Sequence, residues 1–162
     1  MASRVSALAA EAASRPRTLG TRLFETRRLS VALTESLSPE DMVVQAMDDA
    51  SPTKWHLAHV TWFFETFVLA KHLPGYRVFD ERFNFCFNSY YESQGARHPR
   101  AKRGLLTRPG IAEVFSYRTH VDEALARLFA KFGEPEGEVA SLIEIGLVER
   151  DAHDPGRADA LA

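Results

Sequence analysis

The sequence predicts an all-α protein, a four-helix bundle with a long irregular crossover between the second and third helices. Three observations support this prediction. Apolar residues recur at helical spacing in four segments, start and stop signals mark most of their ends, and no stretch alternates polar and apolar residues as a half-buried strand would. Because no internal repeat is visible, a single bundle is the simplest arrangement.

The first long helix is predicted over residues 18–35, where leucines and a valine roughly follow an amphipathic pattern and Pro16 lies just upstream. Residues 38–41, Ser-Pro-Glu-Asp, combine a capping hydroxyl, a proline and two acids, which is a strong helix start signal. We expect them to open a short segment that extends through Ala46.

The second long helix should begin at Ser51-Pro52, which repeats this start signal, and run to about His72. Leu-Pro-Gly at residues 73–75 would end it. From residue 76 to residue 108 the composition changes to aromatic, asparagine and basic residues without a clean period. We expect this crossover to be mostly irregular, with short helical turns, and its unusual length makes it a functional suspect.

The third and fourth helices complete the predicted bundle. Thr-Arg-Pro-Gly at residues 107–110 starts the third helix, which carries a long apolar stripe and ends at Gly133. The fourth helix should begin near Glu-Pro-Glu at residues 134–136. It must stop at Asp-Pro-Gly, residues 154–156, and this early end should leave positions near Phe63 and Phe67 partly uncovered.

Length and composition favour one domain with a real core, because 162 residues is an ordinary domain size and 45% of them are hydrophobic. Acidic and basic residues leave a formal charge of -2, so the charge balance gives no case for nucleic acid or a membrane surface as a partner. A small molecule or a protein is the expected partner. We divide the chain into a frayed or disordered arm at residues 1–17, the bundle at 18–153 and an unrelated or disordered tail at 154–162.

The single cysteine, Cys86, excludes an internal disulfide framework and is consistent with a reducing compartment. No apolar run approaches the ~20 residues that cross a bilayer. We therefore expect a cytoplasmic protein. Because Cys86 stands between Phe85 and Phe87, we expect it to be a buried packing thiol.

The stretch SPTKWHLAHVTWFFETFVL, residues 51–69, raises the question of a metal site. His56, His59 and Phe63 share one face of the predicted helix, which should be mostly buried. A histidine removed from water needs a backbone carbonyl, a carboxylate or a metal ion as its partner. A lone histidine on an apolar helix more often has a structural role, so metal binding would need further donors from other helices.

Candidate further donors are His120 on the third helix and the pair Glu149 and His153 on the fourth. Glu149 and His153 are spaced i, i+4, so they share a face and could bind one ion. Such pairs are also common as ordinary solvated charges, and the spacing alone is a weak signal. The residues by themselves therefore leave both readings open.

Three segments resemble the N-terminal DinB-like domain of the ergothioneine-biosynthesis sulfoxide synthases, also called hercynine oxygenases. They are residues 51–69, FNSYYESQGARHPRAKRGLLTRP at 87–109 and AEVFSYRTHVDEAL at 112–125. The resemblance covers roughly residues 19–147 and implies a DinB-like four-helix bundle. In that family the bundle is joined to a C-terminal domain like that of the formylglycine-generating enzyme, and the active site lies between the two.

The resemblance also implies a cofactor and substrates. In the family, Fe(2+) held by three histidines uses oxygen to join the thiol of a cysteine derivative to trimethylhistidine (hercynine), giving a sulfoxide. The second histidine of the WHLAH motif, here His59, is the first iron ligand, and the other two come from an HEQQH-type motif after a Gly-Leu pair. At that place this chain has IGLVERDAH, residues 145–153, which puts His153 on the last ligand and Glu149 where the other histidine stands.

Two readings of these positions remain. Two histidines and a carboxylate would be a workable ligand set for ferrous iron. Alternatively, the match is lost near Leu147 and His153 is a coincidence. Elsewhere, the resemblance places Arg100 and Arg103 at positions that bind the carboxylates of the thiol substrate, and guanidinium groups can do so bidentately. It favours a structural or ligand-supporting role for His120 and Asp122.

The expected function is therefore that of a truncated iron-dependent sulfoxide synthase of ergothioneine biosynthesis. Its substrates in the family are a small-molecule thiol and trimethylhistidine, and the fragment is expected to be inactive alone. One alternative is a non-catalytic DinB-like helical binding module, or one half of a split enzyme whose C-terminal half is separately encoded. A further alternative is a metal-dependent thiol transferase.

Overall fold

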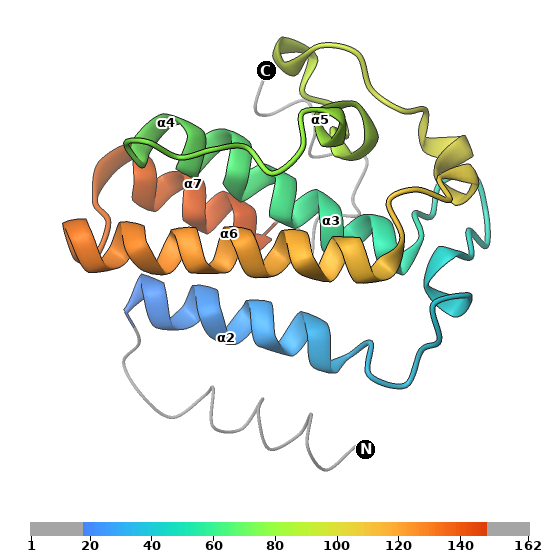
Figure 1. The fold of residues 1–162 in the computed structure, drawn as a ribbon, viewed down its shortest axis with the longest axis horizontal. Coiled ribbons are helices and arrows are strands. Elements are labelled where there is room, and N and C mark those ends of the chain that lie inside the picture. Colours follow the sequence, from blue (N-terminus) through green and yellow to red (C-terminus); the bar gives the residue numbers. More distant parts are fainter. Residues whose placement is uncertain (1–17, 149–162) are drawn as a thin grey trace.

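The computed structural model describes residues 18–148, which form helices and no strands, so the predicted all-α fold is confirmed (Figure 1). Four long segments lie alongside one another, and the crossover caps one side of them. Their bounds are α2, Leu19–Ala32; the continuous run of α3, Thr53–Phe63, η2, Phe64–Leu69, and α4, Ala70–His72; α6, Ile111–Phe132; and α7, Gly137–Val148.

The first helix begins where predicted and the start signal at residues 38–41 caps as predicted, but both open shorter elements than expected. The Thr18 side chain accepts a hydrogen bond from the Thr21 backbone at the start of α2, which ends at Ala32 rather than at residue 35. Ser38 and Asp41 cap each other reciprocally, at 2.9 and 3.2 Å. They open only the 3-10 helix η1, Asp41–Val43, because no apolar period follows to bury a longer helix.

The second long helix runs from Thr53 to His72 as predicted, with one feature that the sequence did not reveal. Its centre, η2, is a π-helical turn. Glu65 on this turn is 2% exposed, and its carboxylate accepts hydrogen bonds from the Tyr76 hydroxyl at 2.6 Å, the Tyr117 hydroxyl at 2.5 Å and the Phe79 backbone at 2.9 Å. Hydrophobic spacing did not indicate this turn, because residues 60–70 are apolar at most positions, so a shift of the helical phase by one residue cannot be seen.

The crossover is a series of short turns, as expected, namely α5, Arg82–Phe87, η3, Glu92–Gln94, and η4, Arg100–Leu105. Asn88 stabilises a turn within the crossover. Its side-chain amide donates to the Tyr91 carbonyl at 2.9 Å and accepts from the Tyr91 backbone N–H at 3.1 Å. Lys54, although only 2% exposed, donates to the carbonyls of Leu106 and Pro109 at 2.6 and 3.0 Å, which anchors the far end on α3.

The expected exposure near Phe63 and Phe67 is wrong, since these side chains are 2% and 9% exposed. The Tyr91 ring from the crossover covers them, with centroids 4.8 Å from Phe67 and 6.0 Å from Phe63. On the other side, α7 approaches closely at Gly146, where an added Cβ would lie 2.6 Å from the Phe64 ring. The apolar faces of α3 and η2 are therefore covered from two directions.

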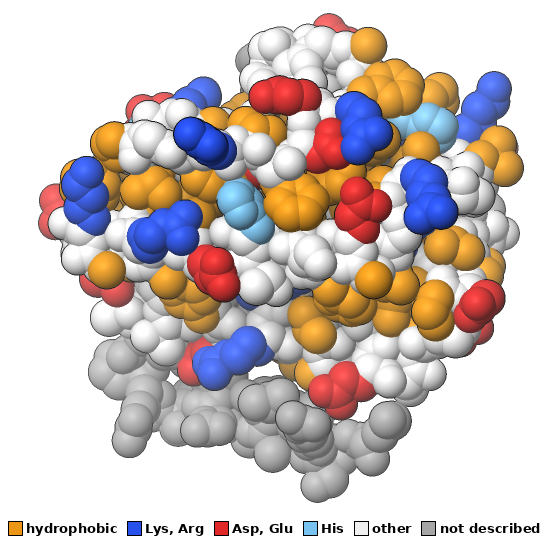
Figure 2. Space-filling model, in the orientation of Figure 1, with side chains coloured by type: hydrophobic (Ala, Val, Ile, Leu, Met, Phe, Trp, Pro, Cys, Tyr) orange, Lys and Arg blue, Asp and Glu red, His pale blue; other side chains and the backbone are white. Residues whose placement is uncertain are grey.

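On the surface, basic and acidic side chains are interspersed over the face shown in Figure 2, in line with the formal charge of -2. α6 ends at Gly133, whose φ of 74° favours glycine, as the stop signal predicted. Among the described helices, none has the length and apolar character needed to cross a membrane.

Candidate functional site

His59 lies on α3, where neighbouring elements fix the orientation of its ring. The residue is only 6% exposed. Its Nδ1 donates a hydrogen bond of 2.7 Å to the backbone carbonyl of Phe87, the last residue of α5. The ring also stacks on Trp55 at 4.5 Å and on Trp62 at 5.7 Å between centroids. The hydrogen bond fixes Nδ1 as the donor, so Nε2 is the ring nitrogen that a metal ion would bind in the neutral tautomer.

The same face of α3 holds α5 in place. Trp55 Nε1 donates to the Cys86 carbonyl at 2.9 Å, and Trp62 Nε1 donates to Asn84 Oδ1 at 3.1 Å. Together with His59, these side chains make three contacts from one helix to the other. The Cys86 thiol is partly buried, and burial raises its pKa, so it fits the expected packing role better than a reactive one.

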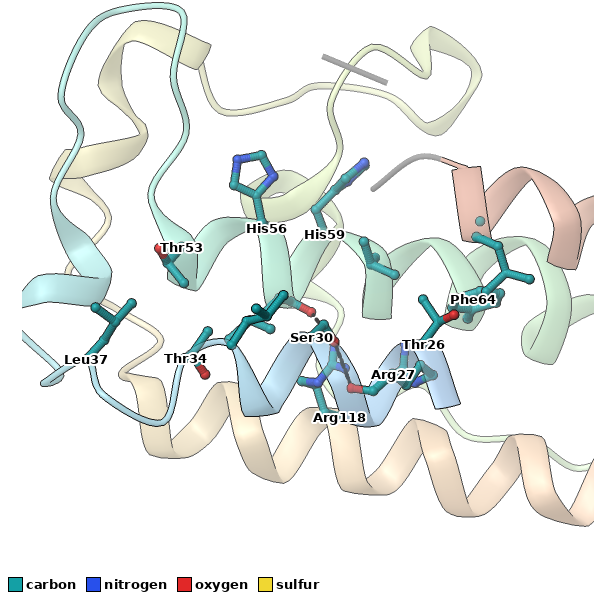
Figure 3. A pocket seen from close by; sticks show the side chains of 15 residues that line it. Thr26, Arg27, Ser30, Thr34, Leu37, Thr53, His56, His59, Phe64 and Arg118 are labelled. Atoms are coloured by element: carbon teal, nitrogen blue, oxygen red, sulfur yellow. Dashed lines mark hydrogen bonds between the residues drawn. The ribbon is translucent and has the colours of Figure 1, made fainter. Parts of the chain in front are cut away.

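The prediction of one buried face is correct for His59 and Phe63 but wrong for His56, which is exposed. Residues three apart on an α-helix differ by about 60° around its axis, so one can be covered while the other faces outward. Figure 3 shows both histidines rising from α3 at the edge of the pocket described below.

The other predicted metal donors do not join His59 within the described residues. His120 lies against the start of the crossover, where its Nε2 contacts the Arg77 carbonyl at 3.1 Å and its ring packs on Tyr76 and Phe79. Glu149 and His153 lie outside the described residues. Between residues 18 and 148 no group of three histidine, cysteine or acidic side chains could hold a metal ion. The proposed iron ligand set of His59, Glu149 and His153 therefore stays a prediction.

Arg103 is 3% exposed and lies against α3. Its guanidinium stacks over the Trp55 ring at 3.4 Å from the centroid, and Nη1 donates to the Ser51 hydroxyl at 2.8 Å. Burial, followed by the charges of Arg100 and Arg97, lowers the pKa of Arg103 to about 9. The guanidinium therefore stays charged at neutral pH, and Trp55 contacts both it and His59.

Arg100 is exposed and lies on the same 3-10 helix, η4. Gln45 holds this helix, because its amide donates to the Arg100 carbonyl at 2.8 Å and accepts from the Gly104 backbone at 2.7 Å. Arg100 and Arg103 thus have different surroundings although they are three residues apart. The binding of substrate carboxylates by this pair stays a prediction.

A pocket of about 450 Å³ opens between α2 and α3, beside the end of α7. Its apolar walls come from α3 and η2, from the end of α7 and from the turn that follows α2, and His59 lies at its edge (Figure 3). Two arginines that the sequence analysis did not select, Arg27 on α2 and Arg118 on α6, also line it. One signal was available, because Arg118 falls on the buried stripe of α6 between Val114 and Val121.

Arg27 and Arg118 are each 3% exposed and join three helices. Arg27 pairs with Asp122 of α6 and donates to Thr61 Oγ1 of α3 at 3.3 Å. Arg118 donates to the carbonyls of Leu57 and Arg27 at 3.0 and 3.1 Å. Burial, followed by the charge of Arg27, lowers the pKa of Arg118 to about 9, so the Arg118 guanidinium stays charged at neutral pH.

The fold and this site define a helical bundle in which one buried histidine, held by a backbone carbonyl and two tryptophans, lies beside a pocket lined by two buried arginines. Comparison with protein families matches residues 22–142 to the DinB superfamily, and the chain belongs to that superfamily. A search of curated proteins gave no match.

Proposed function

We propose that this chain is the DinB-like part of an iron-dependent sulfoxide synthase of ergothioneine biosynthesis. The complete enzyme would act in the cytoplasm and join a cysteine-derived thiol to trimethylhistidine with oxygen. The observation that carries the proposal is the occurrence of three family-like segments in the family's order, with His59 in the first of them. Membership of the DinB superfamily is consistent with this reading but is coarser.

The surroundings of His59 support its role as an iron ligand. The Phe87 carbonyl holds Nδ1, and Trp55 and Trp62 restrict rotation of the ring. A metal-binding histidine commonly donates its other ring nitrogen to a carbonyl in this manner. Glu149 and His153 remain the proposed further ligands.

The thiol substrate would be held by its carboxylates. Arg103 is the better placed of the two proposed residues, because its guanidinium lies on the same Trp55 ring that stacks with His59. Arg100, in the exposed first turn of η4, would add a second, more mobile contact. A guanidinium fixed by stacking loses less freedom when it binds a carboxylate bidentately.

We further propose that these 162 residues are inactive without a second domain or a separately encoded C-terminal half. Formation of a carbon–sulfur bond requires thiol, imidazole and iron-bound oxidant to be held together, and such positioning can contribute about 7 to 11 kcal/mol. A non-catalytic DinB-like binding module is the second candidate. A metal-dependent thiol transferase is a further alternative and would need metal donors in addition to His59.

Anaerobic titration with ferrous iron tests the role of His59. We expect the protein to bind iron no better than roughly micromolar, because one fixed histidine gives little affinity. His59→Ala should abolish this binding, whereas His120→Ala, which removes a histidine bonded elsewhere, should leave it unchanged. Equal binding by wild type and His59→Ala would exclude His59 as a ligand.

An aerobic assay tests the activity. The chain, supplied with trimethylhistidine, cysteine or gamma-glutamylcysteine, iron and oxygen, should give no sulfoxide by mass spectrometry. Sulfoxide made by the chain alone and lost in His59→Ala would overturn the proposed inactivity and support Glu149 and His153 as ligands. Restoration by a separately expressed C-terminal half would support the split-enzyme form of the proposal.

A further inference from the structure

The pocket between α2 and α3 has an uneven distribution of charge. Every ionisable side chain among its described lining residues is basic; these residues are Arg27, His56, His59 and Arg118. The carboxylate that pairs with Arg27 belongs to Asp122, which is not part of the lining and whose side chain is 36% exposed. Among residues 18–148, the two arginines of the pocket wall therefore carry more positive charge than the Asp122 carboxylate balances.

The hydrogen bonds of the two arginines show the same imbalance. Arg27 uses Nε and Nη2, while its buried Nη1 has no acceptor among the described residues. Arg118 uses both terminal nitrogens, while its buried Nε has none. Buried guanidinium nitrogens normally have acceptors, because leaving such a donor unsatisfied is costly. Both unsatisfied donors belong to arginines that line the pocket, so they indicate that an acceptor for these guanidinium groups is missing among the described residues.

The remaining surface of the pocket is mostly apolar, with Leu57, Val60 and Phe64 on the side of α3 and η2. Its volume of about 450 Å³ lies within the usual range for small-molecule sites, about 300 to 1,000 Å³. An occupant that matches these walls would combine one anionic group with an apolar body. A fully hydrated ion such as phosphate would leave the apolar walls without a partner.

We propose that this pocket binds a small organic carboxylate, with its apolar body against Val60 and Phe64 and its carboxylate at the guanidinium groups of Arg27 and Arg118. One monoanion would balance the excess charge of the two arginines over Asp122. The planar guanidinium matches a carboxylate in shape and hydrogen-bonding direction. This site is separate from Arg100 and Arg103 on η4, and it does not depend on the proposed synthase function.

Calorimetric titration with a matched pair of ligands tests the proposal. The probes are 3-phenylpropionate and 3-phenylpropanol, which share an apolar body and differ in charge, with inorganic phosphate as a third. We expect the carboxylate to bind at least about tenfold more tightly than the alcohol. Phosphate should neither bind measurably nor displace the carboxylate. Equal affinity for acid and alcohol, or displacement by phosphate at equal concentration, would overturn the proposal.

Two adjacent arginines on α2 provide a matched control. Arg27→Gln should weaken binding of 3-phenylpropionate at least about tenfold, whereas Arg28→Gln, which removes the same charge from an exposed side chain, should change it little. Circular dichroism would establish that both variants fold. If Arg27→Gln does not fold, Val60→Phe provides the second test. It places a larger side chain in the pocket, leaves both arginines unsubstituted and should abolish binding.

Some results would exclude the site directly. Wild-type affinity in a folded Val60→Phe protein would place the ligand elsewhere, and an equal loss in Arg28→Gln would show a general charge effect. Binding of an acidic helical peptide without binding of any small carboxylate would assign the pocket to a protein partner instead.

Discussion

Two buried charged clusters lie on neighbouring faces of α6, about 100° apart around its axis, and each keeps buried charge stable in a different way. Tyr117 turns toward the Glu65 carboxylate, while the next residue, Arg118, turns toward Arg27 on α2. Glu65 has three neutral or backbone donors and needs no counter-charge. The arginine cluster contains two like charges, one partly exposed carboxylate and two donors without acceptors in residues 18–148.

The difference indicates which side of the bundle is complete in itself. A buried charge that is fully hydrogen-bonded contributes a fixed, specific structure, whereas a half-satisfied network is costly. The Glu65 cluster, on the π turn, therefore has the properties of a structural element. The arginine cluster lines a pocket and has the properties of a place where something else binds.

The largest expected effect is on the Glu65 side. Glu65→Leu would leave the hydroxyls of Tyr76 and Tyr117 and the Phe79 backbone without their acceptor, at a cost of about 1 to 3 kcal/mol for each buried donor. We expect the free energy of unfolding to fall by at least about 3 kcal/mol in urea denaturation. A loss below about 1 kcal/mol would show that these donors find other partners.

Arg118→Met should lower the free energy of unfolding less than Glu65→Leu does, although Arg118 makes more hydrogen bonds than Glu65. The backbone carbonyls that lose Arg118 as a donor each keep another one. The Thr61 hydroxyl donates to the Leu57 carbonyl at 2.8 Å, and the Ser30 hydroxyl donates to the Arg27 carbonyl at 2.7 Å. Its removal also relieves repulsion from Arg27. We expect a loss of about 2 kcal/mol in the same urea experiment. A loss larger than that of Glu65→Leu would break the comparison between the clusters.

Alkaline pH should act on the Glu65 side through Tyr117. Burial and the neighbouring Glu65 carboxylate raise the pKa of Tyr117 well above its ordinary value of 10.0. The unfolded chain therefore releases this proton near pH 10 while the folded chain keeps it, so stability is lost as the pH rises above 10. At pH 11 this contribution should be about 1.4 kcal/mol.

Tyr117→Phe isolates this effect. Urea denaturation of both proteins at pH 8 and pH 11 should show a smaller alkaline loss in the variant, because Cys86 and the other tyrosines titrate equally in both. The same loss in both proteins would contradict the raised pKa of Tyr117.

The smallest effect is expected at an exposed arginine on the same helix as Arg27. Arg22 binds Glu144 of α7 with both terminal nitrogens, at 2.5 and 2.9 Å, but each side chain is 45% exposed. Solvent screens such a pair, so Arg22→Gln should lower the free energy of unfolding by about 1 kcal/mol or less. A larger loss in thermal or urea melting would mean that this contact, rather than packing at Gly146, holds α7 in place.

The sequence was sufficient for the fold because caps and stops act locally. The cap formed by Ser38 and Asp41 and the stop at Gly133 both depend on residues within one helical turn. It did not reveal the π turn or the burial of Phe67. Both depend on residues far along the chain, such as Tyr91, which covers Phe67.

The candidate site was only partly predictable for the same reason. His59 was selected from its motif and its apolar face, and the structure adds the Phe87 carbonyl that orients it. Arg27 and Arg118 were missed because an arginine on a helix usually points into solvent with only its stem covered. Their burial depends on carbonyl and hydroxyl groups of α2 and α3, which no local pattern reports.

The stacking around His59 also gives the protein a built-in optical reporter. The chain has two tryptophans, and both of them, Trp55 and Trp62, stack on the His59 ring. All of its indole fluorescence therefore originates beside the candidate metal ligand. Quenching of that emission would register events at His59 without any introduced label.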